Sequence, residues 1–286
     1  MPLVSAAQVL PQARRRGYAV GAFSIHTPEM VDAVFAAGER LQSPLILQVG
    51  RRAVQQSGVE EACAWVRRRA ARSPVPAVLH LDHALDLGAI LRGLRAGCTS
   101  VMYDGSDLPL EENVRRTSEI VATCHAVDVP VEAEVGRMSG VEDDLTVEEA
   151  EGRLATAELC VRFVQETGCD VLAPAVGSVH GLGQGVPHLR LDLLTSIAAV
   201  VDLPLVLHGG SGLDPQQLAG AIRAGVAKVN VDTELRRTFV QALGQALEVF
   251  APRDDPRPAL LAAESAVAEQ VALRIGHFGS AGHARD

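Results

Sequence analysis

Eight short apolar runs that alternate with eight helical segments constrain the fold of this chain more than any other feature. The apolar runs are rich in β-branched residues and end at turn residues, as buried strands do. They cover 18–23, 45–49, 75–81, 100–103, 130–135, 171–174, 204–207 and 228–231. The helical segments lie near 28–41, 59–72, 86–96, 110–127, 154–167, 191–200, 214–224 and 233–249. Strict alternation requires parallel strands joined by crossover helices, and eight such units predict an α/β fold of the closed (β/α)8, or TIM, barrel type.

The length of 286 residues suits a single barrel domain, because such barrels often reach ~250 residues. We expect the barrel and one extra helix near 252–273 to occupy residues 1–275, and residues 276–286 to form a loose polar tail. A weak internal repeat, "LRAGCTSVMYD" (94–104) and "IRAGVAKVNVD" (222–232), supports the strand–helix units. Its glycines, Gly97 and Gly225, suit the left-handed position that ends a helix.

Charge and cysteine content exclude several classes of protein. The net charge is −9, whereas nucleic acids and anionic membranes bind clustered Lys and Arg, so we expect neither partner. The runs Arg14–Arg16 and Arg67–Arg69 are interpreted as solvated helix faces or ends. Five cysteines without a C-x-x-C pair predict buried thiols in a reducing compartment. The sequence shows neither a signal pattern nor an apolar run of ~18 residues, so we expect a cytoplasmic location.

Polar residues follow six consecutive predicted strands, at the point where each strand ends. In barrels of this type the active site lies on the loops after the carboxyl ends of the strands. In chain order these residues are Asp82 and His83, Asp104, Glu132 and Glu134, His180, His208, and Asn230 to Thr233. Three neutral imidazoles with an open fourth position form the ligand set of a catalytic Zn²⁺, and nearby carboxylates orient such ligands or act as acid and base. The pattern therefore predicts a metal-dependent enzyme.

Two loops add candidate binding elements. In "HGGSGLDP", Gly209 and Gly210 allow close backbone approach and Ser211 supplies a hydroxyl, and loops after strands seven and eight often bind phosphate. An ordinary glycine-rich turn is the alternative interpretation of this segment. Residues 136–152 exceed the usual ~2–6 residues of such a loop, which predicts a lid that carries carboxylates.

Taken together, these motifs resemble the class II, metal-dependent ketose-bisphosphate aldolases, which comprise fructose- and tagatose-1,6-bisphosphate aldolases. The resemblance covers nearly the whole chain. It rests on "AFSIH" (22–26), "HLDH" (80–83), "SVMYD" (100–104), "VEAEVG" (131–136), "GVEDD" (140–144), "GSVHG" (177–181), "LPLVLHGGSGL" (203–213), "KVNVDTEL" (228–235) and "DPR" (255–257). It implies a lyase that reversibly cleaves a ketose 1,6-bisphosphate to dihydroxyacetone phosphate and glyceraldehyde 3-phosphate.

The resemblance also implies roles for single residues. Zn²⁺ would be held by His83, His180 and His208, with Glu134 and Asp104 in a secondary metal position or orienting the ligands. Asp82 would be the acid/base at the C4 hydroxyl, and Glu142 would exchange the proton at the enediolate carbon. The dihydroxyacetone phosphate site, often with a nearby Na⁺ or K⁺, would comprise Gly181, Gly209, Gly210, Ser211, Asn230, Val231, Asp232 and Thr233. Arg257 would reach the distal phosphate, from its own subunit or a neighbouring one of a homodimer or homotetramer.

Departures from the family pattern bear on the substrate. Ser24 stands where the family usually has Asn, Ser139 replaces a lid glycine, and "LGQG" (182–185) follows Gly181 where an aromatic residue is common. Since Ser24 and the segment 182–185 are expected to contact substrate, they leave the sugar open. The "NVDT" form favours fructose 1,6-bisphosphate over its tagatose epimer.

Two other hypotheses concern the chemistry. A class I aldolase would form a Schiff base on Lys228, the single lysine, but strand rise places that residue ~6–7 Å below the rim. A non-catalytic sugar-phosphate-binding barrel would have no need of an acid/base such as Asp82 beside a metal. Within "HLDH", His80 is expected to have a structural role inside the strand. A turn that begins at Asp82 is expected to let Asp82 and His83 both face the mouth.

Overall fold

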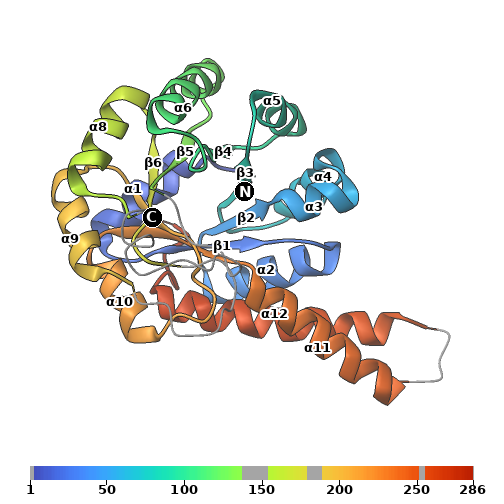
Figure 1. The fold of residues 1–286 in the computed structure, drawn as a ribbon. Coiled ribbons are helices and arrows are strands. Elements are labelled where there is room, and N and C mark those ends of the chain that lie inside the picture. The colour runs from blue at the N-terminus through green and yellow to red at the C-terminus, as the bar shows by residue number, and fades with distance from the viewer. Residues whose placement is uncertain (1–2, 137–153, 179–188, 251–254, 286) are drawn as a thin grey trace.

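The computed structural model of the chain describes residues 3–136, 154–178, 189–250 and 255–285. Eight parallel strands form a closed barrel in the order of the sequence, from β1 to β8 and back to β1. Helices surround the barrel (Figure 1). The structure thus confirms the predicted (β/α)8 barrel, a single domain with an additional C-terminal helix.

All predicted strands are present, with small differences at their ends. The strands are β1 Val20–Ser24, β2 Leu45–Val49, β3 Ala77–Ala84, β4 Ser100–Tyr103, β5 Val131–Val135, β6 Val171–Pro174, β7 Leu205–Leu207 and β8 Val226–Val231. The helices are α1 Ala6–Arg16, α2 Pro28–Leu41, α3 Arg51–Ser57, α4 Val59–Ala70, α5 Leu87–Ala96, α6 Leu110–His125, α8 Ala157–Thr167, α9 Leu191–Val200, α10 Pro215–Arg223, α11 Thr233–Phe250 and α12 Arg257–Phe278. The sequence analysis did not predict α1 and α3.

Local signals define many of the helix ends. Thr27, Asp86 and Asp214 precede α2, α5 and α10, and their side chains accept backbone N–H groups of the first turn. The two glycines of the internal repeat adopt left-handed conformations, with φ of 95° at Gly97 and 109° at Gly225. Both therefore act as predicted, allowing the chain to leave a helix and enter the next strand.

Helix α1 closes the end of the barrel opposite the carboxyl ends of the strands. Its Leu10 and Ala13 belong to the same buried cluster as the strand residues Val20, Ile46 and Val78. Pro11 lies inside this helix. Because proline lacks the N–H that continues a helix, its presence argued against a helix here in the sequence. The packing of its apolar face against the barrel offsets that loss.

Two arginines that were interpreted as solvated make structural contacts instead. The half-buried Arg14 donates hydrogen bonds to the carbonyls of Ala198 (3.2 Å), Val201 (2.7 Å) and Leu203, which follow or end α9. Arg69 forms a two-pronged ion pair with Glu39 at 2.8 and 2.9 Å. The solvated interpretation is therefore wrong for both residues.

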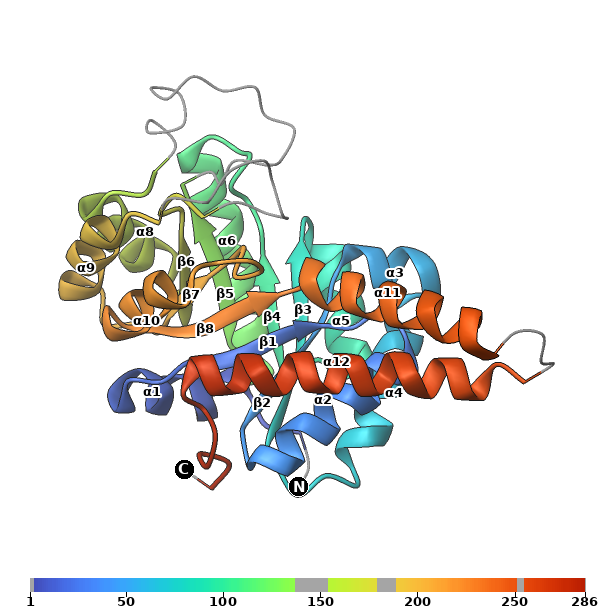
Figure 2. The ribbon, with the colours of Figure 1, turned by 90° about the horizontal axis from the view of Figure 1, so that it is seen from below.

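Helices α11 and α12 form a long hairpin that extends away from the barrel (Figures 1 and 2). Helix α12 begins at Arg257, not near 252, because Pro256 and Pro258 favour a helix start, and it continues to Phe278 before Gly279 ends it at φ 71°. The returning half of the hairpin packs on α2 and β1 through buried residues such as Val271 and Phe278.

The last described residues are packed, so the expectation of a loose polar tail from residue 276 is wrong. Gly282 N–H donates to the Leu41 carbonyl at 2.9 Å, and Ala284 N–H donates to the Gln42 carbonyl at 2.8 Å. The His283 ring stacks on Tyr18 with the ring centres 4.1 Å apart. These contacts attach the tail to the end of α2 and the segment before β1.

The cysteine prediction agrees with the structure, in which Cys63, Cys98, Cys124, Cys160 and Cys169 are all buried and free. Within the described residues, no helix has both the length and the apolar character needed to span a membrane.

Candidate active site

The carboxyl ends of the strands bring most of the predicted site residues to one mouth of the barrel. Strand β3 contributes Asp82 and His83 by an irregular geometry. Its pairing with β4 shifts register between Leu81 and Ala84, and His83 adopts a left-handed conformation with φ 51°. Regular alternation would place Asp82 and His83 on opposite faces of the strand, whereas such a bulge re-aims the side chains. The strand continues to Ala84, so the turn predicted at Asp82 is absent. The bulge, in place of a turn, allows Asp82 and His83 both to face the mouth.

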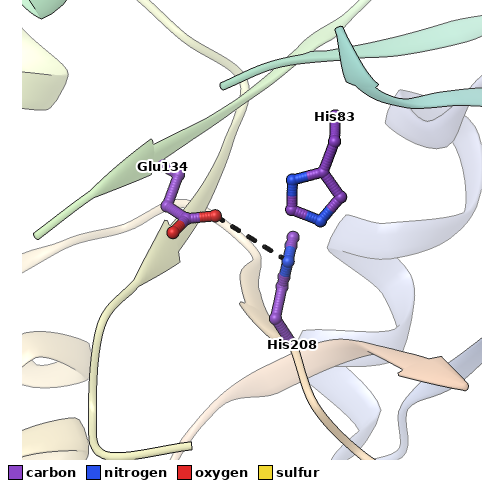
Figure 3. A group of neighbouring side chains, drawn as sticks. All are labelled: His83, Glu134 and His208. Atoms are coloured by element: carbon purple, nitrogen blue, oxygen red, sulfur yellow. Dashed lines mark ion pairs between the residues drawn. The ribbon is translucent and has the colours of Figure 1, made fainter. Parts of the chain in front are cut away.

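His83, Glu134 and His208 form a compact cluster with the spacing of metal ligands (Figure 3). One potential ligand atom of each residue lies within 4.8 Å of the others. His208 Nδ1 is 3.8 Å from Glu134 Oε2, and the two imidazole rings meet edge to face with their centres 4.9 Å apart. Glu134 Oε2 is buried and has no hydrogen-bond partner among the described residues. Because an unsatisfied buried carboxylate oxygen is costly, a cation at this point fits the donor set.

Asp104 orients His83 from behind. Its Oδ2 lies 2.7 Å from His83 Nδ1, and its Oδ1 accepts hydrogen bonds from the backbone N–H and hydroxyl of Ser106 at 3.1 and 2.7 Å. The other ring nitrogen of His83, Nε2, lies 4.0 Å from Asp82 Oδ2 on the mouth side. This is the arrangement in which a carboxylate fixes one nitrogen of a histidine so that the other can bind a metal.

Excess negative charge surrounds the cluster. Burial raises the pKa of Glu134 to about 8, and the neighbouring Asp104 carboxylate acts in the same direction. Burial acts to lower the pKa of His83, but the Asp82 carboxylate and the hydrogen bond to Asp104 outweigh it and raise that pKa to about 9. The high pKa values of Glu134 and His83 reflect the negative charge of Asp82 and Asp104 beside them, and a divalent cation would neutralise that charge in place of the two protons.

Asp82 lies beside the cluster without belonging to it. Its Oδ1 accepts a hydrogen bond of 2.8 Å from Gln48 Nε2, and its side chain is 11% exposed. Burial opposes ionisation, but the charge of His83 and then that of Lys228 lower the pKa of Asp82. An ionised, oriented carboxylate at the mouth is suited to accept a proton from a substrate hydroxyl.

Gln48 was not among the predicted site residues, although it is fully buried in β2. The available signal was one polar residue in the otherwise apolar strand "LILQV" (45–49). Such a residue in a barrel interior needs a polar partner, and here that partner is Asp82.

A polar layer inside the barrel supports the cluster from below. Lys228 Nζ donates to Glu132 Oε2 at 2.7 Å, and Glu132 Oε1 lies 3.0 Å from His208 Nε2. Burial opposes ionisation of Glu132, but Lys228 and the hydrogen bond with His208 hold its pKa below the ordinary value. His80 is 1% exposed, and its Nδ1 lies 2.9 Å from Ser100 Oγ, inside the strand as expected. The ion pair with Glu132 occupies Lys228, which argues against the Schiff-base hypothesis.

The glycine-rich loop after β7 packs against the end of β8. Gly209 has a φ of 66°, and Gly210 N–H donates to the Asn230 carbonyl at 3.1 Å. A Cβ at position 210 would lie 2.8 Å from that carbonyl oxygen, so only glycine fits. Ser211 Oγ accepts the N–H of Asp232 at 3.4 Å, and Asn230 Oδ1 is buried without a hydrogen-bond partner among the described residues. The predicted phosphate-binding residues of the two loops therefore meet.

The other residues predicted at the end of β8, Val231 to Thr233, lie in different surroundings. Val231 packs in the core between strands and helices, which leaves only its backbone to a ligand at the mouth. The carboxylate of Asp232 contacts His26 Nε2 at 2.8 Å and Arg236 Nε at 3.0 Å. Burial acts to raise the pKa of Asp232, but the hydrogen bonds with His26 and Arg236 outweigh it and lower that pKa to about 2. Thr233 begins α11, and its Oγ1 accepts a hydrogen bond from Arg236 at 3.2 Å. His26, the last residue of "AFSIH", was not predicted to belong to the site.

The remaining predictions have different outcomes. Ser24 is buried at the carboxyl end of β1. His180, Gly181 and Glu142 lie outside the described residues, as do Ser139 and the rest of the predicted lid from 137 onward. Arg257 is the first residue of α12, 81% exposed and paired with Asp255 at 2.8 Å, and α12 begins at the outer end of the hairpin that extends away from the barrel (Figure 2).

Comparison with known proteins gives a consistent result. The family described as class II fructose-bisphosphate aldolase matches residues 4–283. A sulfofructosephosphate aldolase from Alkalicoccus urumqiensis is 35% identical over all of this chain and 99% of that protein. The crystal structure of the YdjI aldolase from Escherichia coli K12 has a TM-score of 0.89 and 30% identity, covering 99% of this chain and 100% of that one. The fructose-bisphosphate aldolase of Campylobacter jejuni shares the fold, with a TM-score of 0.86, 20% identity, and coverage of 98% and 96%.

Proposed function

The chain belongs to the class II fructose-bisphosphate aldolase family and is a lyase, and from this premise we propose that it cleaves the C3–C4 bond of a ketose bisphosphate with the aid of Zn²⁺. The products would be dihydroxyacetone phosphate and glyceraldehyde 3-phosphate. The observation that carries the proposal is the cluster of the half-buried His83 with the buried Glu134 and His208, beside the ionised Asp82.

His83 and His208 are the proposed metal ligands in the described part of the chain, with Glu134 facing the same point and Asp104 holding His83. His180 is the proposed third imidazole. A bound Zn²⁺ supplies a Lewis acid that stabilises the negative charge developing on the dihydroxyacetone phosphate half as the bond breaks. The unsatisfied Glu134 Oε2 and the surrounding carboxylates support a divalent ion at this point.

Asp82 is the proposed base, which accepts the proton of the C4 hydroxyl during cleavage and returns it during condensation. Gln48 holds one carboxylate oxygen through its 2.8 Å hydrogen bond, which leaves the other oxygen for the substrate. Glu142 is the proposed group that exchanges the proton at the carbon left by cleavage.

The loops after β7 and β8 are the proposed site of the substrate's 1-phosphate. Gly209, Gly210 and Ser211 lie against the residues 230–233, at the amino end of α11, where helix N–H groups and the helix dipole favour an anion. A Na⁺ or K⁺ ion near these loops, contacts from Ser24 and Gly181, and a cytoplasmic location remain part of the proposal.

Arg257 is proposed to bind the distal phosphate of a substrate molecule in the active site of a neighbouring subunit. Helix α11 has 18 residues and begins at the mouth, so the hairpin carries Arg257 ~27 Å away from its own site. That distance exceeds the reach of an arginine side chain. This placement supports a homodimer or homotetramer in which the hairpin of one subunit approaches the mouth of another.

A sulfofructose phosphate is the second candidate substrate, because the relative that acts on it by name is 35% identical along the whole chain. The two candidates differ at the end of the sugar that Arg257 is proposed to meet. The "NVDT" segment, Asn230 to Thr233, leads us to place fructose 1,6-bisphosphate first.

An assay for dihydroxyacetone phosphate release tests the proposal. Purified protein is offered fructose 1,6-bisphosphate, tagatose 1,6-bisphosphate and sulfofructose 1-phosphate, before and after chelation and after addition of Zn²⁺. We expect cleavage that is lost on chelation, restored by Zn²⁺ and fastest on fructose 1,6-bisphosphate. A higher kcat/KM on sulfofructose 1-phosphate would select the second candidate. Activity that survives complete metal removal would reject the proposed mechanism.

A further inference from the structure

The barrel interior below the candidate metal cluster holds an ion pair that the proposed reaction does not use. Lys228 of β8 and Glu132 of β5 are each 1% exposed, and Lys228 Nζ donates to Glu132 Oε2 over 2.7 Å. The other carboxylate oxygen, Oε1, lies 3.0 Å from His208 Nε2. One buried carboxylate therefore joins the only lysine of the chain to a proposed metal ligand.

The hydrogen bonds of this group have defined directions. A lysine ammonium only donates and an ionised carboxylate only accepts, so the hydrogen between Glu132 and His208 belongs to His208 Nε2. A neutral imidazole with its N–H at Nε2 carries its lone pair on Nδ1. That nitrogen lies 3.8 Å from Glu134 Oε2, inside the candidate metal cluster.

We propose that Lys228 and Glu132 are positioning residues that fix His208 in the Nε2–H tautomer and thereby direct the lone pair of Nδ1 at the metal. This inference rests on the metal site of the proposed function. A carboxylate behind a metal-binding histidine commonly has this role. The feature of this chain is that the carboxylate lies in the barrel core, where Lys228 balances its charge in place of water.

The surroundings exclude the other histidine beside Glu132 from this role. His80 Nε2 is 3.7 Å from Glu132 Oε2, beyond hydrogen-bond distance, and His80 Nδ1 contacts Ser100 Oγ at 2.9 Å instead.

Of the 26 lysine and arginine residues of the chain, only Lys228 is a lysine. A compact ammonium suits a single carboxylate oxygen in a closed interior, whereas an arginine would bring five donors that all need partners.

The variant Glu132→Gln tests the tautomer directly. Lys228 still needs an acceptor, so the amide oxygen is expected to face Lys228 and the amide NH₂ to face His208 Nε2. His208 must then carry its hydrogen on Nδ1, and we expect affinity for Zn²⁺ and Co²⁺ to fall ~10–100-fold. Chelator competition measures the affinity, and the imidazole ¹⁵N spectrum of the metal-free, histidine-labelled protein reports the tautomer, with the His208 signal assigned from its loss in His208→Gln.

The double variant Glu132→Gln/Lys228→Met separates positioning from packing. Without the ammonium, the amide oxygen can turn to His208 Nε2, so the Nε2–H tautomer and most of the metal affinity are expected to return. Glu234→Gln is the matched control, because it breaks another largely buried ion pair, with Arg274, away from the cluster. It is expected to leave metal affinity unchanged.

Several results would overturn the inference. It fails if Glu132→Gln binds metal as tightly as the parent, if its His208 keeps the Nε2–H tautomer, or if a folded double variant stays as weak as the single one. If the double variant does not fold, the ¹⁵N spectrum of Glu132→Gln decides. If the unaltered protein binds no metal at this site, the proposed function fails instead, while the spectrum of the metal-free protein still tests the tautomer.

Discussion

His83 adopts a φ of 51°, in the left-handed region that a non-glycine residue enters at a cost of roughly 1–2 kcal/mol. The bulge that contains it lets consecutive residues of β3 both serve the mouth of the barrel. Asp82 is held by Gln48, and His83 is held by Asp104, so neighbouring side chains have separate supports. At the scale of single residues, the site depends on these supporting contacts as much as on the reacting groups.

Asp82→Asn tests the division of labour between these neighbours. The amide keeps the shape and the hydrogen bond to Gln48 but cannot accept a proton, so kcat is expected to fall ~10²–10⁴-fold. Bound zinc should remain, because Asp82 lies outside the cluster, whereas His83→Ala should release it. Elemental analysis and the cleavage assay measure the two properties, with the exposed Asp202→Asn as control. Loss of zinc in Asp82→Asn would show that Asp82 is a ligand.

Asp232→Asn tests the contacts of Asp232 with His26 and Arg236 through their pH dependence. The folded-state pKa of about 2 lies below the ~3.9 of an unfolded aspartate. The carboxylate therefore contributes to the free energy of unfolding above pH ~4 and loses this contribution as the pH falls toward 2. With the side chain 37% exposed, we expect a loss of at most ~1 kcal/mol at pH 7. Urea unfolding at several pH values measures it, and a difference that does not shrink in acid would contradict the prediction.

At the scale of single elements, α1 depends on contacts with distant parts of the chain. Its apolar face closes the amino end of the barrel, and Arg14 reaches from it to carbonyls at the end of α9. Helix carbonyls at that end lack intrahelical partners, so a guanidinium there satisfies groups that α9 leaves open. One side chain thus connects elements that lie far apart in the sequence.

Arg14→Met is expected to lower the free energy of unfolding by ~1–3 kcal/mol, because half-buried carbonyls lose their donor while most of the packing remains. The matched control is Arg15→Met on the same helix, since Arg15 is exposed and bonds only Gln12 in the described contacts. Denaturant unfolding compares the variants. Equal stability of the two would mean that Arg14 is as solvated as the sequence suggested.

At the scale of the whole molecule, the α11–α12 hairpin extends away from the barrel (Figure 2), and Arg257 is the residue at which α12 begins, at the outer end of that hairpin. The inner half of α12 is anchored on α2 and β1, and the buried Arg274 pairs with Glu234 of α11. The hairpin therefore has a fixed base. A residue at its tip acts on catalysis only if another subunit receives it.

A mixture of two inactive variants tests this arrangement. Arg257→Ala keeps a complete barrel site, and Asp82→Asn keeps a complete hairpin, so a mixed dimer contains one site with both residues. After dissociation and reassociation in equal amounts, we expect the mixture to regain about a quarter of the parent activity. The cleavage assay follows the recovery, and mixing without subunit exchange is the control. A mixture no more active than the mean of its parts would show that Arg257 does not serve a neighbouring subunit.

Local pattern alone predicted the eight strands, most of the helices and the glycines that end them. These features depend on residues close in sequence, through apolar periodicity and backbone preference. The same pattern placed Asp82, His83, Glu134 and His208 at one mouth, because parallel strands of a barrel end together. It misjudged α1, Arg14 and the tail after residue 276, whose structures depend on surfaces formed by distant parts of the chain.

By itself, the sequence determined the barrel, the order of its strands and the end at which the polar residues gather. Only the tertiary structure decided which atoms meet there. The contact of Lys228 with Glu132 joins residues 96 positions apart, and that of His208 with Glu132 joins residues 76 apart. Periodicity assigns a side chain to a face of its own strand but cannot say what faces it across the barrel. Since hydrogen bonds act over about 3 Å, only the closed fold determines these partners.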